Sequence, residues 1–130
     1  MSCWFPLRLS CKGTTRIVLV VWPLALKFAR GERGRRCNRF EAHTYNTVSV
    51  RRRAMLCPVL GCTSRGHVLL MRAAWPLTEA EAARLRATRG LPEWDWEGPN
   101  DEGSPFEPKA SDWGWLNGRL VALDYSTPEL

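Results

Sequence analysis

The sequence predicts an α+β domain, a small antiparallel sheet with one or two packed helices, and three observations support this class. Residues 16–22 and 24–29 are rich in the β-branched and large apolar side chains that favour strands. Residues 78–90 carry the start and stop signals of a helix. The pair Asn117-Gly118, with apolar residues on both sides, is typical of a tight β-hairpin.

A single domain is expected from the size of the chain, because 130 residues of which 45% are hydrophobic can build one compact core. We assign residues 1–15 to an N-terminal extension and residues 16–130 to the domain. The apolar run Ile17–Leu26 contains Pro23 and is too short to span a bilayer, so we interpret it as core strands and expect no membrane partner. A signal peptide is the competing interpretation, although no small-residue cleavage site follows the run.

The five cysteines are odd in number and irregularly spaced, which indicates neither a disulfide framework nor a zinc site. Cys57 and Cys62 with His43 or His67 form an alternative metal site, but paired ligands at short spacing are missing. We therefore expect reduced thiols, as in a cytoplasmic protein.

Positive and negative charges are unevenly divided along the chain. Residues 1–76 hold fourteen Lys and Arg against two acids, whereas residues 77–130 hold five against eleven, so the net charges are +12 and −6. This division indicates a nucleic acid or an acidic protein at the basic half, or two halves that face each other within the molecule. Alternatively, the arginines are only solvated faces. The candidates for a basic surface are Arg35, Arg36, Arg51, Arg52 and Arg53.

The first helix is expected after the second strand. Residues 31–36 look like a polar, basic connection, and Asn38-Arg-Phe-Glu41 suggests a helix that is capped at Asn38 and continues to Val50. A further strand is expected over residues 67–71, after the turn signal Ser64-Arg65-Gly66.

A second helix begins after Thr78, which forms a capping box with Glu81, and ends at Gly90. Residues 91–109 then combine acids, Pro, Gly and Asn with aromatic side chains, which predicts an irregular acidic loop. Loops of this length often carry function, so we expect a partner-binding surface here. Its candidate residues are Trp94, Trp96, Glu97, Asp101 and Glu102.

The hairpin around Asn117-Gly118 leads to Asp124. Residues 120–123 are apolar on both faces of the strand, so the strand should be buried. A carboxylate at its end is costly to bury without a partner, which makes Asp124 a candidate metal ligand. The alternative is that Asp124 caps the turn into Tyr125 and Ser126.

Three charged residues form a candidate nucleotide clamp: Lys27 on the second strand, Glu41 in the following helix, and Asp124 after the hairpin. A strand lysine held by a helix glutamate can bind nucleotide phosphates, and an aspartate opposite can hold the magnesium that bridges them. The alternative is that Lys27 and Glu41 form only a structural ion pair.

In this arrangement the chain resembles the protein-kinase-like fold in a reduced form, especially small phage-encoded kinase-like proteins. Ala25-Leu26-Lys27 is similar to the third-strand Val-Ala-Ile-Lys signature, Asn38-Arg-Phe-Glu41 to the helix-C segment, and Asp124-Tyr125-Ser126 to Asp-Phe-Gly. Residues 69–73 resemble the hinge strand, where the backbone would meet an adenine ring.

The resemblance implies a site for ATP and Mg²⁺. The residues that it assigns are Lys27, Glu41 and Met71 for the nucleotide, Asp112 and Asp124 for the metal, and Glu107 and Lys109 for catalysis.

The chain also departs from the family. No Gly-x-Gly-x-x-Gly loop precedes the first strand, residues 107–112 lack the His-Arg-Asp triplet, and only four residues follow Ser126. We therefore expect a degenerate scaffold without a cofactor, in a phage or mobile-element accessory protein that acts by binding a macromolecular partner. That partner would be a host or phage protein, such as a nucleic-acid-binding host defence complex that the chain inhibits. The alternative is a small ATP/Mg²⁺-dependent phosphotransferase.

Overall fold

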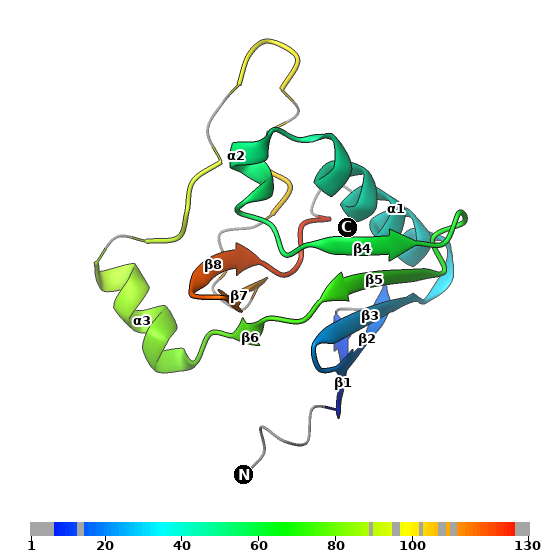
Figure 1. Cartoon of the computed structure of the whole chain (residues 1–130), viewed down its shortest axis with the longest axis horizontal. Coiled ribbons are helices and arrows are strands. Elements are labelled where there is room, and N and C mark those ends of the chain that lie inside the picture. The colour runs from blue at the N-terminus through cyan, green and yellow to red at the C-terminus, as the bar shows by residue number, and fades with distance from the viewer. Residues whose placement is uncertain are drawn as a thin grey trace.

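The structure, a computed structural model, describes residues 7–12, 15–88, 90–94, 97–101, 103–106, 109 and 112–126. Its larger sheet has five antiparallel strands in the order β1-β2-β3-β5-β4, and its smaller sheet has three in the order β6-β7-β8 (Figure 1). Together with three helices, these sheets confirm the predicted α+β class. The strands of the larger sheet are β1 (Leu7–Lys12), β2 (Arg16–Val21), β3 (Leu24–Ala29), β4 (Val59–Cys62) and β5 (Val68–Arg72).

Strands β2 and β3 lie where the sequence predicts them, and their register decides which side chains lie on the inner face of the sheet. Burial alternates along β2, so that Arg16, Val18 and Val20 are buried. Val18 is opposite Lys27 of β3, which is opposite Leu69 of β5. Because residues directly opposite each other share a face, Arg16 and Lys27 both lie on the inner face.

Strand β1 lies within the segment that the sequence assigns to an N-terminal extension. It pairs with the whole of β2, from Leu7 opposite Val21 to Lys12 opposite Arg16. The signal for this strand is the alternation of apolar and polar residues in Leu-Arg-Leu-Ser-Cys-Lys. The sheet therefore starts before residue 16.

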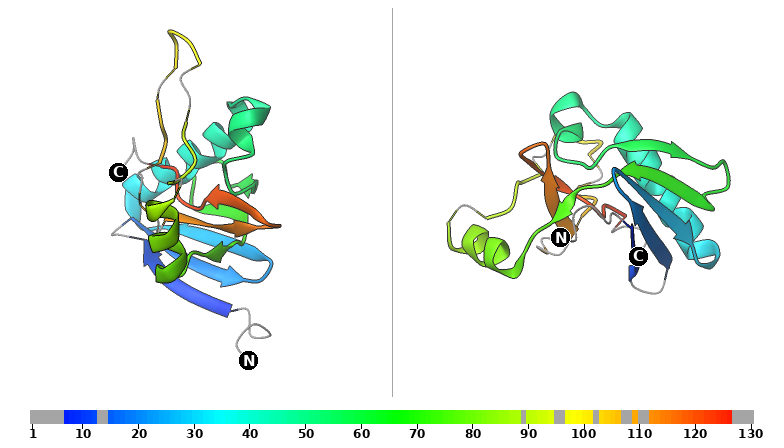
Figure 2. Two further views of the ribbon diagram at one scale, coloured as in Figure 1. Left: turned by 90° about the vertical axis from the view of Figure 1, so that its left-hand side faces the viewer. Right: turned by 60° about the horizontal axis from the view of Figure 1, so that its bottom comes forward.

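Helix α1 (Gly31–Thr47) corrects the prediction of a basic connection followed by a helix that starts at Asn38. Residues 31–36 form its first turns, since arginine is a good helix former and most of these side chains face solvent. The helix packs against β3, β4 and β5 (Figure 2). Its buried residues recur at three- and four-residue spacing and are Gly34, Cys37, Asn38, Glu41 and Thr44.

Gly34 allows α1 to approach the sheet closely. A Cβ atom at this position would lie 2.2 Å from the backbone oxygen of Thr15 and 3.1 Å from the Cα atom of Ala29. The Thr15 oxygen accepts a hydrogen bond of 2.6 Å from the backbone N–H of Arg30, which restrains it. We expect Gly34→Ala to lower the free energy of unfolding by about 1–3 kcal/mol, although alanine normally stabilises a helix interior.

Chemical denaturation of the Gly34→Ala variant measures this effect. Gly61→Ala on β4 is the matched control, because a Cβ atom at Gly61 would meet no atom within 4 Å. A Gly34→Ala variant that unfolds at the same denaturant concentration as the control would contradict the prediction.

The C-terminal hairpin consists of β7 (Trp113–Leu116) and β8 (Arg119–Ala122) and forms as predicted. Asn117 and Gly118 both have positive φ, at 52° and 78°, as the tight turn requires. The hairpin pairs with β6 (Trp75–Pro76) through β7.

The main hydrophobic core joins this hairpin to the larger sheet. The backbone N–H of Cys57 donates to the oxygen of Ala122 at 2.9 Å, and the N–H of Ala122 donates to the oxygen of Met55 at 2.8 Å. The largest fully buried apolar side chains of this core are Leu56, Leu69, Met71, Trp113, Val121 and Tyr125.

Two short helices complete the fold. In α3 (Glu79–Ala87) the capping box is confirmed, since Thr78 and Glu81 each accept a hydrogen bond from the backbone N–H of the other. Helix α2 (Val50–Arg53) is capped by Ser49 and follows α1 directly. No helix in the described part of the chain is long and apolar enough to cross a membrane.

The acidic segment after α3 contains no helix or strand among its described residues between 90 and 109. It runs from α3 past α2, and its tip projects from the rest of the molecule (Figure 1). This agrees with the irregular loop that the sequence predicts.

Candidate functional site: a buried polar cluster

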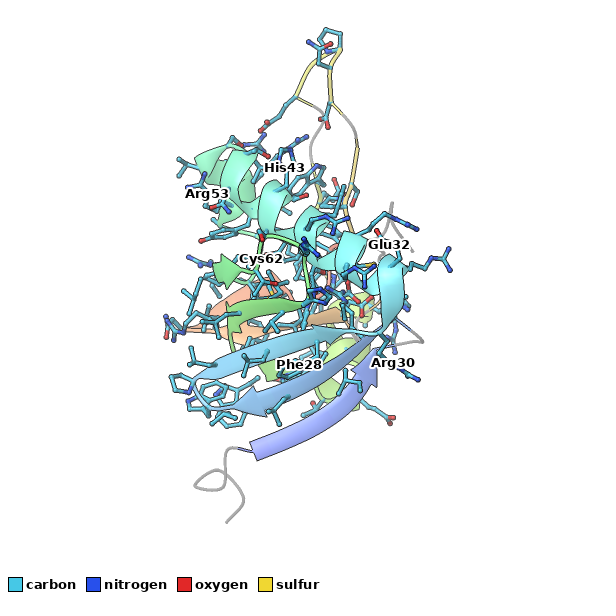
Figure 3. The ribbon with its side chains drawn as sticks, turned by 90° about the vertical axis from the view of Figure 1, so that its right-hand side faces the viewer. Phe28, Arg30, Glu32, His43, Arg53 and Cys62 are labelled. Atoms are coloured by element: carbon cyan, nitrogen blue, oxygen red, sulfur yellow. The ribbon has the colours of Figure 1, made fainter. Side chains whose placement is uncertain are left out.

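The polar residues on the inner face of the larger sheet meet the buried side of α1 and the end of the hairpin. β2 contributes Arg16, β3 contributes Lys27, and α1 contributes Asn38 and Glu41, all buried. The segment 124–126 closes the cluster after β8. Figure 3 shows α1 lying across the sheet, with Arg30 and Glu32 beside the end of β3 that carries Phe28.

Glu41 is the centre of the cluster and has no exposed surface. Its Oε1 atom accepts hydrogen bonds from Arg16 Nη1 at 2.9 Å and from Lys27 Nζ at 2.8 Å. Its Oε2 atom accepts from Arg16 Nη2 at 3.2 Å and from the backbone N–H of Tyr125 at 2.8 Å. Both carboxylate oxygens are therefore occupied by internal donors.

Arg16 links the helix to the C-terminal segment. Its guanidinium donates to Asn38 Oδ1, Asp124 Oδ1 and Ser126 Oγ, each at 3.1 Å, as well as to Glu41. Sequence reasoning missed this residue as part of the site. The signal that identifies it is its place in the strand, because alternation puts Arg16 on the same face as the buried valines of β2.

The structure brings together the three residues of the predicted clamp. Lys27 pairs directly with Glu41, and it donates a second hydrogen bond of 2.7 Å to the backbone oxygen of Leu123. Asp124 follows Leu123 and reaches Glu41 through the shared Arg16. The side chain of Lys27 is only 4% exposed, so the clamp is closed rather than open to solvent.

Charges balance within this cluster, which holds two cations and two carboxylates. Burial lowers the pKa of the Lys27 ammonium below its ordinary value, and the attraction of Glu41 offsets this only in part. Burial also opposes the charge on Arg16, but Glu41 and Asp124 together outweigh it and raise the pKa of Arg16. The arrangement thus holds Arg16 charged at the centre of the cluster.

Asp124 caps the turn that follows it. Its Oδ1 atom accepts hydrogen bonds from the backbone N–H of Ser126 at 3.4 Å and from Ser126 Oγ at 3.1 Å, in addition to that from Arg16. This geometry fits the capping alternative, and it commits one oxygen of the candidate metal ligand to internal partners.

The segment that resembles a hinge is part of the core. Met71 is 2% exposed. After it, the backbone N–H of Ala73 donates to the oxygen of Pro23 at 2.8 Å. One backbone donor of this segment is thus bound within the protein.

The predicted catalytic segment is described only in part, because Glu107 lies outside the described residues. Lys109 is exposed, and its Nζ atom lies 3.9 Å from Asp112 Oδ2. The backbone oxygen of Asp112 accepts a hydrogen bond of 2.7 Å from Leu123, so Asp112 lies near the start of the Asp124 turn. Among the described residues, no group of three or more His, Cys, Asp and Glu is placed to hold a metal ion.

Two carboxylates of the acidic loop, Glu97 and Asp101, are bound by arginines of α2. Arg52 pairs with Asp101, and its guanidinium carbon lies 4.5 Å from the centre of the Trp94 ring. Glu97 accepts hydrogen bonds from Arg51 at 2.9 Å and from Ser49 at 3.0 Å. The basic and acidic parts of the chain therefore face each other here, as one interpretation of the charge pattern predicts.

This contact is well buried at its centre, where the Arg52 side chain is 8% exposed and the Asp101 side chain 2%. The Arg52 donors, with the backbone N–H groups of Gly103 and Glu97, hold the pKa of the Asp101 carboxyl far below its ordinary value. A cavity of about 450 Å³ lies beside the contact, between the C-terminal half of α1 and the loop. Trp96 and Glu102 lie outside the described residues.

The remaining predicted arginines differ in their surroundings. Arg53 donates to the backbone oxygens of Tyr45 and Val48 and so satisfies the C-terminal end of α1. Arg35 pairs with Glu32 one turn earlier, and Arg36 is exposed. Arg51 of α2 is exposed as well, but it is paired with Glu97.

Searches against family models, curated proteins and solved structures find no match for this chain.

Proposed function

We propose that this chain is a non-catalytic binding protein, built on a degenerate kinase-like scaffold, that acts through contact with a macromolecular partner. The observation that carries the proposal is the position of Arg16. Its guanidinium lies between Glu41 and Asp124, where the nucleotide interpretation requires phosphates and a metal ion.

Because Arg16 already balances charge within the cluster, the cluster does not need a nucleotide or a metal ion to do so. Mg²⁺ needs carboxylate oxygens that are open to it, but Oδ1 of the candidate ligand Asp124 already accepts hydrogen bonds from Arg16 and from the backbone N–H and hydroxyl of Ser126. Phosphates need the Lys27 ammonium, which is bound to Glu41 and Leu123 and is nearly inaccessible. Filling the site with nucleotide would first require breaking a charge cluster that is neutral as it stands.

A binding role therefore belongs to the surface of the domain. Glu97 and Asp101 of the acidic loop are paired with Arg51 and Arg52, so they offer little charge to a partner. The exposed arginines of α1 remain for that role. The sequence suggests two partner classes: a host or phage protein, including a nucleic-acid-binding complex of host defence, or a nucleic acid at the basic half of the chain.

The second candidate is a small ATP/Mg²⁺-dependent phosphotransferase. The observation that favours it is the contact of 2.8 Å between Lys27 and Glu41, since a strand lysine fixed by a helix glutamate is a requirement of kinase-like phosphoryl transfer. Asp112 and Asp124 would then hold Mg²⁺, and Arg16 would have to withdraw from Asp124.

Thermal melting with and without nucleotide separates the two candidates. We expect ATP with Mg²⁺, at millimolar concentration, to leave the melting temperature of the wild type unchanged relative to Mg²⁺ alone. Lys27→Ala serves as the control, and the nucleotide-dependent shift is compared within each variant so that a change in basal stability does not matter. A rise in the wild type that Lys27→Ala abolishes would instead establish nucleotide binding, because a ligand present at 100 times its Kd stabilises by about 2.7 kcal/mol.

A further inference from the structure

One end of α1 and the turn between β4 and β5 together form a strongly basic surface. Arg33, Arg36 and Arg39 are exposed along the first turns of α1, and Arg30, which precedes the helix, is exposed at the same end (Figure 3). A cavity of about 450 Å³ lies between the helix and the turn. The residues that line it are Glu32, Arg35, Arg39, Ser64, Arg65 and His67.

The turn is fixed firmly against the helix. Gly66 lies so close that a Cβ atom on it would be 2.3 Å from the backbone oxygen of Arg35. The Asn38 amide donates to the Gly66 oxygen at 2.8 Å, and Arg39 Nη1 donates to the Arg65 oxygen at 2.6 Å. These contacts hold the backbone of Arg65 and Gly66 beside the arginines of the helix.

Positive charge at this surface is far in excess of negative charge. Residues 30–39 and 64–67, all of them described, contain six arginines, at 30, 33, 35, 36, 39 and 65, and one acid, Glu32. Glu32 pairs with Arg35 and lies 3.6 Å from Arg39, so it offsets at most part of their charge. The surface thus has a net charge of +5 from these seven residues.

We propose that this basic surface binds the phosphate backbone of a nucleic acid without reading its sequence. Arginine presents a planar fork of donors that matches phosphate oxygens, and several arginines spread over a helix and a turn suit a ligand with repeated phosphates. The residues that line the cavity include no aliphatic, Phe, Tyr or Trp side chain. Aromatic side chains are enriched at the centre of protein interfaces, so a lining without them favours a nucleic acid over an acidic protein. This inference rests on the proposed binding function and names the class of its partner.

The test is fluorescence anisotropy of a labelled 20-nucleotide single strand and a labelled duplex of mixed sequence, titrated with the full chain at several salt concentrations. We expect the double variant Arg33→Gln/Arg65→Gln to bind about tenfold more weakly and to reduce the slope of log K against log salt by about 1–2. The matched control is Arg84→Gln/Arg86→Gln, which removes the same charge from exposed positions of α3. The control should keep most of the affinity and slope.

Three results would overturn the inference, and the first two are no binding at low salt and equal losses of affinity in the two double variants. A third is displacement of the oligonucleotide by poly-glutamate at equal charge concentration, which would indicate an acidic protein as partner. Melting of each variant verifies that it is folded. ATP with Mg²⁺ is tested on the same samples, so a chain that binds neither ligand overturns only the nucleic-acid inference, whereas nucleotide binding overturns the non-catalytic proposal.

Discussion

Replacing Glu41 with methionine should lower the free energy of unfolding by about 3–5 kcal/mol, as is typical when one member of a buried charge cluster is removed. Methionine has a similar volume, so the effect is electrostatic rather than a cavity. The change leaves Lys27 and Arg16 buried with only Asp124 to balance them, and it removes the acceptor of the Tyr125 N–H. Urea denaturation of the wild type and the variant measures the difference.

We also expect that the effects of substituting Lys27 and Glu41 on the free energy of unfolding are not additive. The double variant Lys27→Met/Glu41→Met removes one cation and one anion, so Arg16 and Asp124 remain as a neutral pair. It should therefore be more stable than Glu41→Met alone, even though it carries one more substitution. A double variant that is as unstable as the sum of the two single variants would show that the charge balance does not govern this site.

Replacing Trp113 with alanine should lower the free energy of unfolding by about 3–5 kcal/mol, the range for a large aromatic side chain in a packed core. Trp113 has no exposed surface, and its ring meets the edge of Phe106 with centroids 4.8 Å apart. Phe106 in turn packs against Trp94, at 5.5 Å, so the substitution also removes the support of the acidic loop. Denaturation monitored by circular dichroism gives the free energy of unfolding.

Trp75→Ala is the matched control for this prediction. Trp75 lies on the neighbouring part of the same sheet but is 51% exposed, and its ring stacks on Trp22 with centroids 4.3 Å apart. We expect Trp75→Ala to lower the free energy of unfolding by no more than about 2 kcal/mol, because the side chain is only partly buried and makes one aromatic contact. Similar decreases in the free energy of unfolding for the two variants would mean that the core does not extend through Trp113 to the acidic loop.

The elements that could be predicted from the sequence are those with local causes. The hairpin turn needs only two residues that accept positive φ, and the α3 cap needs only two side chains three positions apart. Strands β2 and β3 follow from a run of β-branched and apolar residues. In each case the interactions that define the element lie within a few positions of one another.

The start of α1 could not be placed in the same way. Residues 31–36 have the composition of a polar loop, and the only apparent cap, Asn38, is in fact a buried residue that bonds to Lys27 and Gly66. The helix is extended to Gly31 by its packing on the sheet, in which Gly34 and Cys37 are buried. Tertiary packing here outweighs the local signals.

By itself, the sequence determined the fold class, the hairpin, the capped helix, and the fact that Lys27, Glu41 and Asp124 are the charges that need partners. Only the tertiary structure decided that those partners are internal. Arg16 lies 25 residues from Glu41 and 108 from Asp124, and no local pattern reports contacts over such separations. A buried charge must find a counter-charge wherever the fold brings one, and here the fold brings Arg16 into contact with both Glu41 and Asp124.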